Sequence, residues 1–334
     1  MAKIKAFLCK IYKKVIERQI MLDIVIIGSG PAGLSAAIYG SRSGLDILVI
    51  EKISHGVGQI AEADCINNYL GFSSIRGFEL GMQFRTHAEA CGVRFQESEA
   101  IKLERTDACW KIYAKDGSCI QSKTVIYAAG ASHRQLNVFG EEALIGKGVS
   151  YCATCDGTFY KGKDVAVIGG GNTAGGDSLY LSVLCHKVYL IHRQNSFRAN
   201  TESLTNLKSK KNVHIITPAK VTKIIGEEAM GVFAVQVETN NSTIPNETLH
   251  KTSDIPVSGV FVAVGRQPAT DILQGIVPLN EQGYIVANEN GRTSLDNFFA
   301  AGDVRSKENR QIITAAADGA NAAISAEKYL TARI

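Results

Sequence analysis

The fold is decided by the stretch Leu22-Asp23-Ile24-Val25-Ile26-Ile27-Gly28-Ser29-Gly30-Pro31-Ala32-Gly33. Its first six residues are an apolar run that predicts a strand, and its glycines form the pattern Gly-x-Gly-x-x-Gly. The residues from Leu34 to about Ser43 predict a helix, and a second apolar strand, 47–50, ends at Glu51. Strand, turn, helix and strand within about 30 residues predict a βαβ unit that opens with a nucleotide-binding turn.

The same order of elements recurs about 140 residues further along the chain. A strand at 165–168 runs into Gly169-Gly170-Gly171-Asn172-Thr173-Ala174, a helix follows at about 175–184, and a strand at 187–191 ends at His192-Arg193. Two such units predict an α/β protein with two Rossmann-like, three-layer dinucleotide-binding domains.

Further segments indicate how the two domains are completed. Residues 102–128 alternate in polarity around a turn at Asp116-Gly117, and 220–246 resemble them. Residues 259–265 and 297–301 predict buried strands, and the Ala-rich stretch 312–330 predicts a helix. We therefore expect the second domain to be inserted in the first.

Composition limits the class of protein. The chain has 334 residues, of which 45% are hydrophobic and 20% charged, with 32 Gly and 6 Pro, so intrinsic disorder, collagen and coiled coil are excluded. The formal net charge is +4, but residues 1–20 hold six Lys or Arg against Glu17. The other residues carry 30 basic and 31 acidic side chains, so the globular part is near neutral and nucleic-acid binding is not expected.

The location of the protein is predicted from what the sequence lacks. No apolar run reaches the ~20 residues needed to span a bilayer, the N-terminal segment fits a secretory signal poorly, and the eight cysteines are scattered. We expect a cytoplasmic protein without a membrane span. The basic extension 1–20 has two interpretations: a leader outside the fold, or a basic amphipathic helix that touches a membrane or a partner.

The residues that end each βαβ unit predict which nucleotide it binds. In the first, Glu51 can accept hydrogen bonds from a ribose and would repel a 2′-phosphate, so FAD or NAD is expected. In the second, the strand ends in His192-Arg193-Gln194-Asn195-Ser196-Phe197-Arg198, and its arginines suit a 2′-phosphate. NADPH is therefore favoured over NADH there, although surface arginines on a loop are the simpler alternative.

Cys152-Ala153-Thr154-Cys155-Asp156 is the reactive candidate. A Cys-x-x-Cys is a redox dithiol, half of a zinc site, or two buried cysteines. Zinc needs about four ligands, and no second Cys-x-x-Cys or His pair occurs, so we predict no metal site. Asp156 can exchange a proton with a thiol when the disulfide opens.

These parts together predict a route for electrons from NADPH to a flavin, to the Cys152–Cys155 disulfide and on to an outside disulfide. The cysteine pair lies only about 14 residues before the second glycine cluster, so both belong to the NADPH domain. Nicotinamide and disulfide cannot both occupy the flavin face, and we expect one domain to rotate against the other. The chain should cross between the domains near 132–142 and 265–269.

The sequence resembles the low-molecular-weight thioredoxin reductases from Met21 to the C-terminal helix. The motifs that carry the resemblance are Gly28-Ser29-Gly30-Pro31-Ala32-Gly33, Cys152-Ala153-Thr154-Cys155-Asp156-Gly157, Gly169-Gly170-Gly171-Asn172-Thr173-Ala174, Ala301-Gly302-Asp303-Val304 and Arg310-Gln311. The resemblance implies a homodimeric FAD enzyme that uses NADPH to reduce thioredoxin or a thioredoxin-like protein.

The resemblance also implies roles for single residues. Cys155 would face the flavin, Cys152 would attack thioredoxin, and Asp156 would be the acid/base. Gln59 and Asn68 match contacts of the flavin domain, Asp303 matches a residue at the ribityl or phosphate region, and Gln311 matches one near the isoalloxazine.

Four departures from the family pattern stand out. Two are mild and lie in the flavin domain, at Gly56-Val57-Gly58-Gln59 and at Ala128-Ala129-Gly130. The third is Ala174-Gly175-Gly176-Asp177, where the family has Ala-x-Glu-Glu: two glycines weaken a helix start by roughly 0.5–1 kcal/mol each, and a carboxylate near the nicotinamide is lost. In the fourth, Gln194 replaces a phosphate-binding arginine, which predicts NADPH use with weakened discrimination.

We therefore predict a basic extension at 1–20, an FAD-binding domain at 21–135 and 265–334, and an NADPH-binding domain at 136–264. The predicted flavin-site residues are Gly28, Ser29, Gly30, Pro31, Ala32, Gly33, Glu51, Lys52, Gln59, Asn68, Gly130, Gly302, Asp303, Arg310, Gln311 and Ile312. The predicted NADPH-site residues are Gly169, Gly171, Asn172, Thr173, His192, Arg193 and Arg198. The predicted catalytic residues are Cys152, Cys155 and Asp156.

Three other functions remain open. A ferredoxin-dependent flavin thioredoxin reductase with a degenerate NADPH site is the runner-up. A flavin-binding redox sensor with negligible turnover belongs to a different class. A ferredoxin–NADP reductase is disfavoured because such relatives lack the redox pair.

Overall fold

The computed structural model describes residues 21–53, 55–63, 65–197, 199, 201–241 and 249–332. The chain divides into two compact units, which we call unit 1 (the described residues of 1–132 and 268–334) and unit 2 (those of 133–267). Both boundaries lie within three residues of the predicted ones. The basic extension 1–20 lies outside the described residues.

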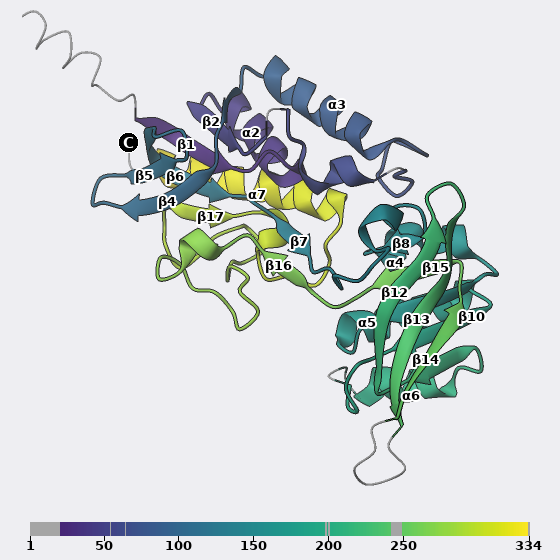
Figure 1. The fold of residues 1–334 in the computed structure, drawn as a ribbon. Coiled ribbons are helices and arrows are strands. Elements are labelled where there is room, and N and C mark those ends of the chain that lie inside the picture. Colours follow the sequence, from purple (N-terminus) through teal and green to yellow (C-terminus); the bar gives the residue numbers. More distant parts are fainter. Residues whose placement is uncertain are drawn as a thin grey trace, which may run out of the picture. The chain divides into compact units, whose positions relative to one another are not determined.

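Unit 1 is built on a seven-stranded sheet (Figure 1). Its parallel strands follow the order β3 (Arg94–Glu97), β2 (Ile47–Glu51), β1 (Leu22–Ile27) and β6 (Cys119–Tyr127), with β17 (Phe298–Ala300) paired to the end of β6. An antiparallel hairpin, β4 (Ala100–Arg105) and β5 (Trp110–Ala114), joins the start of β6. β1 lies in the middle and is buried on both faces, which explains why its sequence is apolar almost throughout.

Two helices, α2 (Pro31–Arg42) and α7 (Ile312–Thr331), pack on one face of this sheet. Both helices are rich in alanine where they meet Ile24, Ile26 and Val49, so the helix backbones lie close to the sheet. The other face is covered by the hairpin and by the segment before β17, around Trp110 and Phe298. α3 (Gly77–Ala90) packs beside α2 and completes the unit.

Unit 2 has a five-stranded parallel sheet in the order β11 (Val213–Ile216), β10 (Lys187–Ile191), β9 (Asp164–Ile168), β15 (Gly259–Val262) and β8 (Val149–Ser150). Alternate residues of β9 face opposite sides. Ala166 and Ile168 pack against an antiparallel sheet of β12 (Ala219–Glu227), β13 (Gly231–Asn241) and β14 (Leu249–Pro256). Val165 and Val167 pack against α5 (Asn172–Leu184) and α6 (Thr201–Ser209).

The remaining elements are short. β7 (Ala131–His133) pairs with β16 (Arg266–Pro268) where the chain passes between the units, and α4 (Ala153–Asp156) carries part of the cysteine motif. The 3₁₀ segments of the described residues, η1 to η5, lie at Gly58–Glu62, Glu142–Leu144, Gly157–Tyr160, Asp271–Leu273 and Gly302–Val304. Among the described residues, no helix has the length and apolar character needed to cross a membrane.

The predicted fold class is confirmed: two three-layer α/β units, the second inserted in the first. Both glycine-led helices begin three residues earlier than predicted, at Pro31 and Asn172, because the helices start inside the glycine motifs. Helix α3 was not predicted at all. Which nucleotide each unit binds stays a prediction.

Candidate functional site

The first glycine turn requires glycine at two of its positions. Gly28 has φ +108°, and a Cβ there would lie 2.4 Å from the Ala128 carbonyl oxygen. A Cβ on Gly33 would lie 1.8 Å from the Gly28 carbonyl oxygen, so the start of α2 presses directly on the turn. Gly30 caps α2, Pro31 begins it, and its first turn has no acidic side chain. The free backbone N–H groups there can bind an anion such as a pyrophosphate.

Other predicted flavin-site residues gather around this turn. Ser29 Oγ donates to the Gly56 carbonyl oxygen at 2.8 Å. A Cβ on Gly302 would lie 2.8 Å from Ala32 Cβ, so the segment before α7 also reaches the start of α2. The structure thus brings together parts of unit 1 that are far apart in the sequence.

The polar side chains predicted from the family resemblance lie in the same part of unit 1. Gln59, on η1, donates from Nε2 to the Ala131 carbonyl oxygen at 2.7 Å, next to Gly130. Asn68 donates from Nδ2 to Gln311 Oε1 at 3.3 Å. Asn68 and Gln311 are 243 residues apart, and only the fold makes them neighbours.

Glu51 has a partner that the sequence analysis missed. Its buried carboxylate accepts hydrogen bonds from Arg85 Nη1 at 2.8 Å and 2.7 Å, one on each oxygen. Arg85 also donates to Glu89 and stacks on the Phe95 ring at 3.4 Å. A carboxylate has about four lone-pair sites, so Glu51 keeps capacity for a ribose and that role stays a prediction. The adjacent Lys52 is exposed and donates to Glu99 at 2.8 Å.

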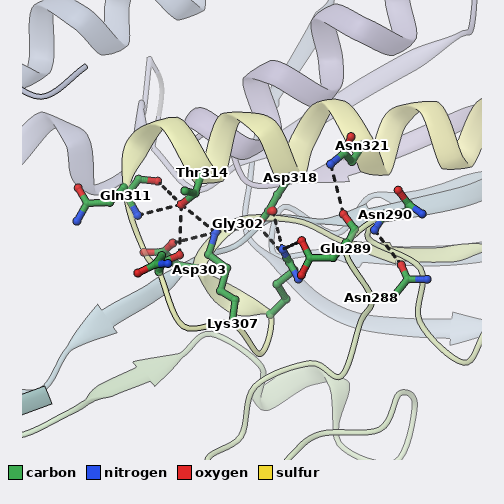
Figure 2. A network of polar contacts seen from close by, with 12 residues as sticks. Asn288, Glu289, Asn290, Gly302, Asp303, Lys307, Gln311, Thr314, Asp318 and Asn321 are labelled. Carbon is green, nitrogen blue, oxygen red and sulfur yellow. Dashed lines mark hydrogen bonds and ion pairs between the residues drawn. The ribbon is translucent and has the colours of Figure 1, made fainter. Parts of the chain in front are cut away.

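A polar network holds the turn at Gly302 and Asp303 (Figure 2). The buried carboxylate of Asp318, on α7, accepts from Gly302 N at 3.1 Å, Arg305 Nε at 2.8 Å and Lys307 Nζ at 2.8 Å. Lys307 Nζ also lies 3.9 Å from Asp303 Oδ1. Burial alone would raise the pKa of Asp318, but hydrogen bonds from Arg305 and Lys307 outweigh it and hold the pKa below its ordinary value.

Arg310, Gln311 and Ile312 lead from this network into α7. The Gln311 N–H donates to Thr314 Oγ1 at 3.1 Å and caps the helix, which fixes the backbone at this point. The Arg310 guanidinium lies 4.3 Å from the centre of the Tyr284 ring, and its buried Nε has no hydrogen-bond partner among the described residues. A buried donor of this kind suits an acceptor on a bound ligand.

The second glycine cluster, Gly169-Gly170-Gly171, ends at the start of α5. Asn172 and Thr173 are exposed there, and the first turn again has no acidic side chain. His192 is 6% exposed, lies in a tilted arrangement beside Phe197 with 4.9 Å between ring centres, and lies against Gly170. Arg193 is exposed, whereas Arg198 lies outside the described residues.

The unusual Gly175-Gly176-Asp177 segment still forms helix. Gly176 is exposed, and a Cβ built there meets nothing within 4 Å. Burial raises the pKa of Asp177 to about 6, although the nearby Arg266 acts in the opposite direction. Because a Cβ at position 176 is unobstructed, a side chain there would be tolerated sterically.

Cys152 and Cys155 form a disulfide with an S–S distance of 2.10 Å. Cys152 caps α4, and the N–H groups of Cys155 and Asp156 donate to the Cys152 carbonyl oxygen at 3.2 Å and 3.1 Å. The Asp156 carboxylate accepts from Ser150 Oγ at 2.6 Å. The structure thus joins the disulfide and the predicted acid/base in one hydrogen-bonded turn.

Three residues at these sites escaped the sequence analysis: Arg85, Ser150 and Asp318. Arg85 carries a usable signal, since it lies four residues after Gly81 and three before Ala88 on the buried face of α3. A cation on a buried helix face needs a buried acceptor. Asp318 interrupts the alanine-rich buried face of α7 in the same way. Ser150 gives no signal, because a serine before a cysteine has many ordinary explanations.

Comparisons with known proteins agree with this geometry. The sequence matches the pyridine nucleotide-disulphide oxidoreductase family over residues 22–319. The thioredoxin reductase of Bacillus subtilis is 36% identical over 308 residues, which cover 92% of this chain and 94% of that protein. That of Treponema pallidum is 39% identical over 311 residues, which cover 92% and 97%. The crystal structure of thioredoxin reductase from Streptococcus pyogenes has a TM-score of 0.87 at 35% identity, covering 94% of this chain and 99% of that one.

Proposed function

Because the chain belongs to the pyridine nucleotide-disulphide oxidoreductase family, we propose that it passes electrons from NADPH through FAD and the Cys152–Cys155 pair to thioredoxin or a thioredoxin-like protein. This family uses a flavin and a pyridine nucleotide. The observation that carries the proposal is the Cys152–Cys155 disulfide in one turn with Asp156, whose N–H donates to the Cys152 carbonyl oxygen, in the unit that also holds the second glycine turn.

The residues of unit 1 fit FAD. The turn at 28–33 offers backbone N–H groups to the pyrophosphate, and Glu51 offers acceptors to the adenosine ribose. Asp303, Gln311 and the unpartnered Arg310 Nε offer polar groups to the rest of the cofactor. When bound, FAD supplies two-electron reduction of the disulfide.

The chain's own residues then carry out the thiol chemistry. Reduction breaks the Cys152–Cys155 bond and takes up two electrons and one proton, giving one thiol and one thiolate. Asp156 supplies that proton, and the Cys152 thiolate attacks the partner disulfide to form a mixed disulfide. Cys155 resolves it and Asp156 takes the proton back. The Cys152–Cys155 disulfide is restored, and the partner leaves with two reduced sulfurs that take their protons from water.

The preference for NADPH over NADH as electron donor can be tested at Arg193. It is exposed and follows the end of β10 by two residues, in the segment where the sequence predicts the 2′-phosphate. We expect Arg193→Ala to slow flavin reduction by NADPH roughly ten-fold, the effect of losing one charged hydrogen bond, and to leave the rate with NADH unchanged. Anaerobic stopped-flow absorbance of the flavin measures both rates. Equal rates with NADPH and NADH in the wild-type protein would contradict the preference for NADPH.

A ferredoxin-dependent reductase is distinguished by an anaerobic titration. NADPH should bleach the bound flavin of the wild-type protein. If only dithionite or reduced ferredoxin bleaches it, the donor is ferredoxin. A redox sensor without turnover is contradicted if NADPH reduces thioredoxin catalytically and Cys152→Ser abolishes this reduction.

The proposal extends to assembly and location. We propose a cytoplasmic homodimer, as the family resemblance implies, without a nucleic-acid partner. Sedimentation of the flavin-loaded protein measures the oligomeric state directly.

A further inference from the structure

Ser150 lies at the base of the redox turn. It is the last residue of β8 and pairs in register with Phe261 of β15, so the sheet of unit 2 fixes its backbone. The residue is 6% exposed. Its Oγ lies 2.6 Å from Asp156 Oδ2 and 3.0 Å from the Cys152 backbone nitrogen. One buried hydroxyl therefore touches both ends of the Cys152–Asp156 segment.

The direction of each hydrogen bond follows from the atoms involved. An ionised carboxylate only accepts, so the single hydroxyl proton of Ser150 points to Asp156. The Cys152 N–H donates to a lone pair of the same oxygen. The Asp156 N–H donates back to the Cys152 carbonyl oxygen at 3.1 Å, which closes a ring of hydrogen bonds.

A second arrangement is available without moving any heavy atom. Ser150 Oγ lies 3.4 Å from the Cys152 carbonyl oxygen. When Asp156 is protonated, its carboxyl group can donate to Ser150 Oγ, and the hydroxyl proton can rotate to that carbonyl. The hydroxyl has two lone pairs, so it can still accept from the Cys152 N–H. Ser150 can thus form a hydrogen bond with the Asp156 carboxyl group in both of its protonation states.

We propose that Ser150 is a positioning residue for proton transfer at the Cys152–Cys155 pair, holding Asp156 in place whether it is ionised or protonated. The inference rests on the proposed function, in which Asp156 gives one proton to the sulfur released when the disulfide takes up two electrons from the flavin. In the return step the Cys155 thiol gives this proton back to Asp156 as the Cys152–Cys155 bond forms again. The outside disulfide takes the two electrons.

The titratable and charged groups near Asp156 come from neighbouring elements of unit 2. Tyr160 lies on η3, and burial together with the charge of Asp156 raises the pKa of Tyr160. Tyr180, on α5, lies against Gly157, and Lys163 Nζ lies 5.7 Å from the centre of the Tyr160 ring. Since the pKa of Tyr160 is raised above 10, it does not titrate in the range tested below.

The test compares Ser150→Ala, Ser150→Thr and Ser182→Ala with the wild-type flavin-loaded protein. Ser182→Ala is the matched control, because Ser182 is also buried in unit 2 but donates to Leu179 of its own helix. NADPH-driven reduction of a bacterial thioredoxin is followed from pH 5.5 to 9. We expect Ser150→Ala to move the acidic limb of the kcat profile up by about one pH unit, because the hydrogen bond to the ionised carboxylate is charge-assisted and stronger than the one made by the protonated form, so its loss disfavours the ionised form.

Ser150→Thr keeps the hydroxyl and should keep the wild-type profile, as should Ser182→Ala. A merely structural role for Ser150 would lower the rate equally at every pH. The iodoacetamide alkylation rate of the reduced pair, measured against pH, gives a second readout, and its midpoint should shift only in Ser150→Ala. If Ser150→Ala does not fold, Ser150→Gly also removes the hydroxyl and takes its place.

Anaerobic reduction of the flavin by NADPH distinguishes a failure of the proposed function from a failure of the role of Ser150. This step does not use the disulfide and should be unchanged in all variants. If the wild-type protein reduces no thioredoxin, the proposed function fails. If the wild-type protein is active and the pH profiles of wild type and Ser150→Ala superimpose, the role of Ser150 is overturned while the proposed function stands.

Discussion

The carboxylate of Asp318 is the residue that ties the Gly302–Asp303 turn to α7. Removing one partner of a buried ion pair leaves the other charges uncompensated and costs about 3–5 kcal/mol. We therefore expect Asp318→Ala to lower the free energy of unfolding by about that amount and to weaken FAD binding, measured by urea unfolding with and without FAD. Glu289→Ala is the control, since Glu289 lies 3.7 Å from Arg305 but is 94% exposed. Equal losses in both variants would contradict the assignment.

The pH dependence of this variant follows from the sign of the pKa shift. The folded-state pKa of Asp318 is lowered, so its contribution is complete above the unfolded-state pKa of about 4 and is lost as the pH falls through the folded-state value. The stability difference between wild type and Asp318→Ala should be constant from pH 5 to 8 and should shrink only in strong acid.

Asp177 should behave in the opposite way. Its folded-state pKa is raised to about 6, so its favourable contribution is present below pH 4 and is lost as the pH rises through 6. We expect Asp177→Asn to be more stable than wild type by about 1 kcal/mol at pH 8, with the difference vanishing near pH 4. Urea unfolding at several pH values measures this, with the exposed Asp107→Asn as control. A difference that does not depend on pH would contradict the raised pKa.

At the scale of single elements, α5 carries a local weakness that packing overcomes. Gly176 is exposed in this helix and a Cβ there is unobstructed, so Gly176→Ala should raise the free energy of unfolding by about 0.5–1 kcal/mol. Gly259→Ala, in β15, is the matched contrast, because its Cβ would lie 2.4 Å from the Tyr160 ring and should destabilise the protein. Thermal unfolding of Gly176→Ala and Gly259→Ala measures the two changes in stability. The prediction fails if Gly176→Ala lowers the melting temperature.

The elements that the sequence predicted are those with a strong local pattern. The glycine motifs flanked by apolar runs predicted β1, α2, β9 and α5, and alanine density predicted α7. Helix α3 was missed because Gly77, Gly81 and the aromatic residues around Leu80 give no clear helical signal. Its stability comes from contacts with Val57 and Ile60, which only the folded chain provides.

The site was predictable to the same degree. Backbone features such as the turn at Gly28 follow from local sequence, whereas side-chain partners do not. Arg85 meets Glu51 across 34 residues, and Asn68 meets Gln311 across 243. Such pairs depend on how strands and helices are arranged in space, which residue spacing alone does not encode.

For the whole molecule, the two units differ in how the chain builds them. Unit 2 is one continuous segment with apolar clusters on both faces of its sheet. We expect residues 133–267 expressed alone to unfold cooperatively, measured by circular dichroism on heating. Residues 21–132 alone lack β17 and α7, which bury β6 and α2, and should stay unfolded until a fragment 268–334 is added. Failure of 133–267 to fold would mean that unit 2 depends on unit 1.

The split of unit 1 between the two ends of the chain also sets an order of events on the ribosome. About 170 residues separate the end of β6 from the start of β17, so at 5–20 residues per second the nascent sheet waits roughly 10–30 s for its last strand and helix. Unit 2 is complete before then. The apolar surface of β1, β6 and α2 is exposed throughout this interval, so the growing chain is most vulnerable to aggregation, and most in need of a chaperone, while residues 128–297 are being made.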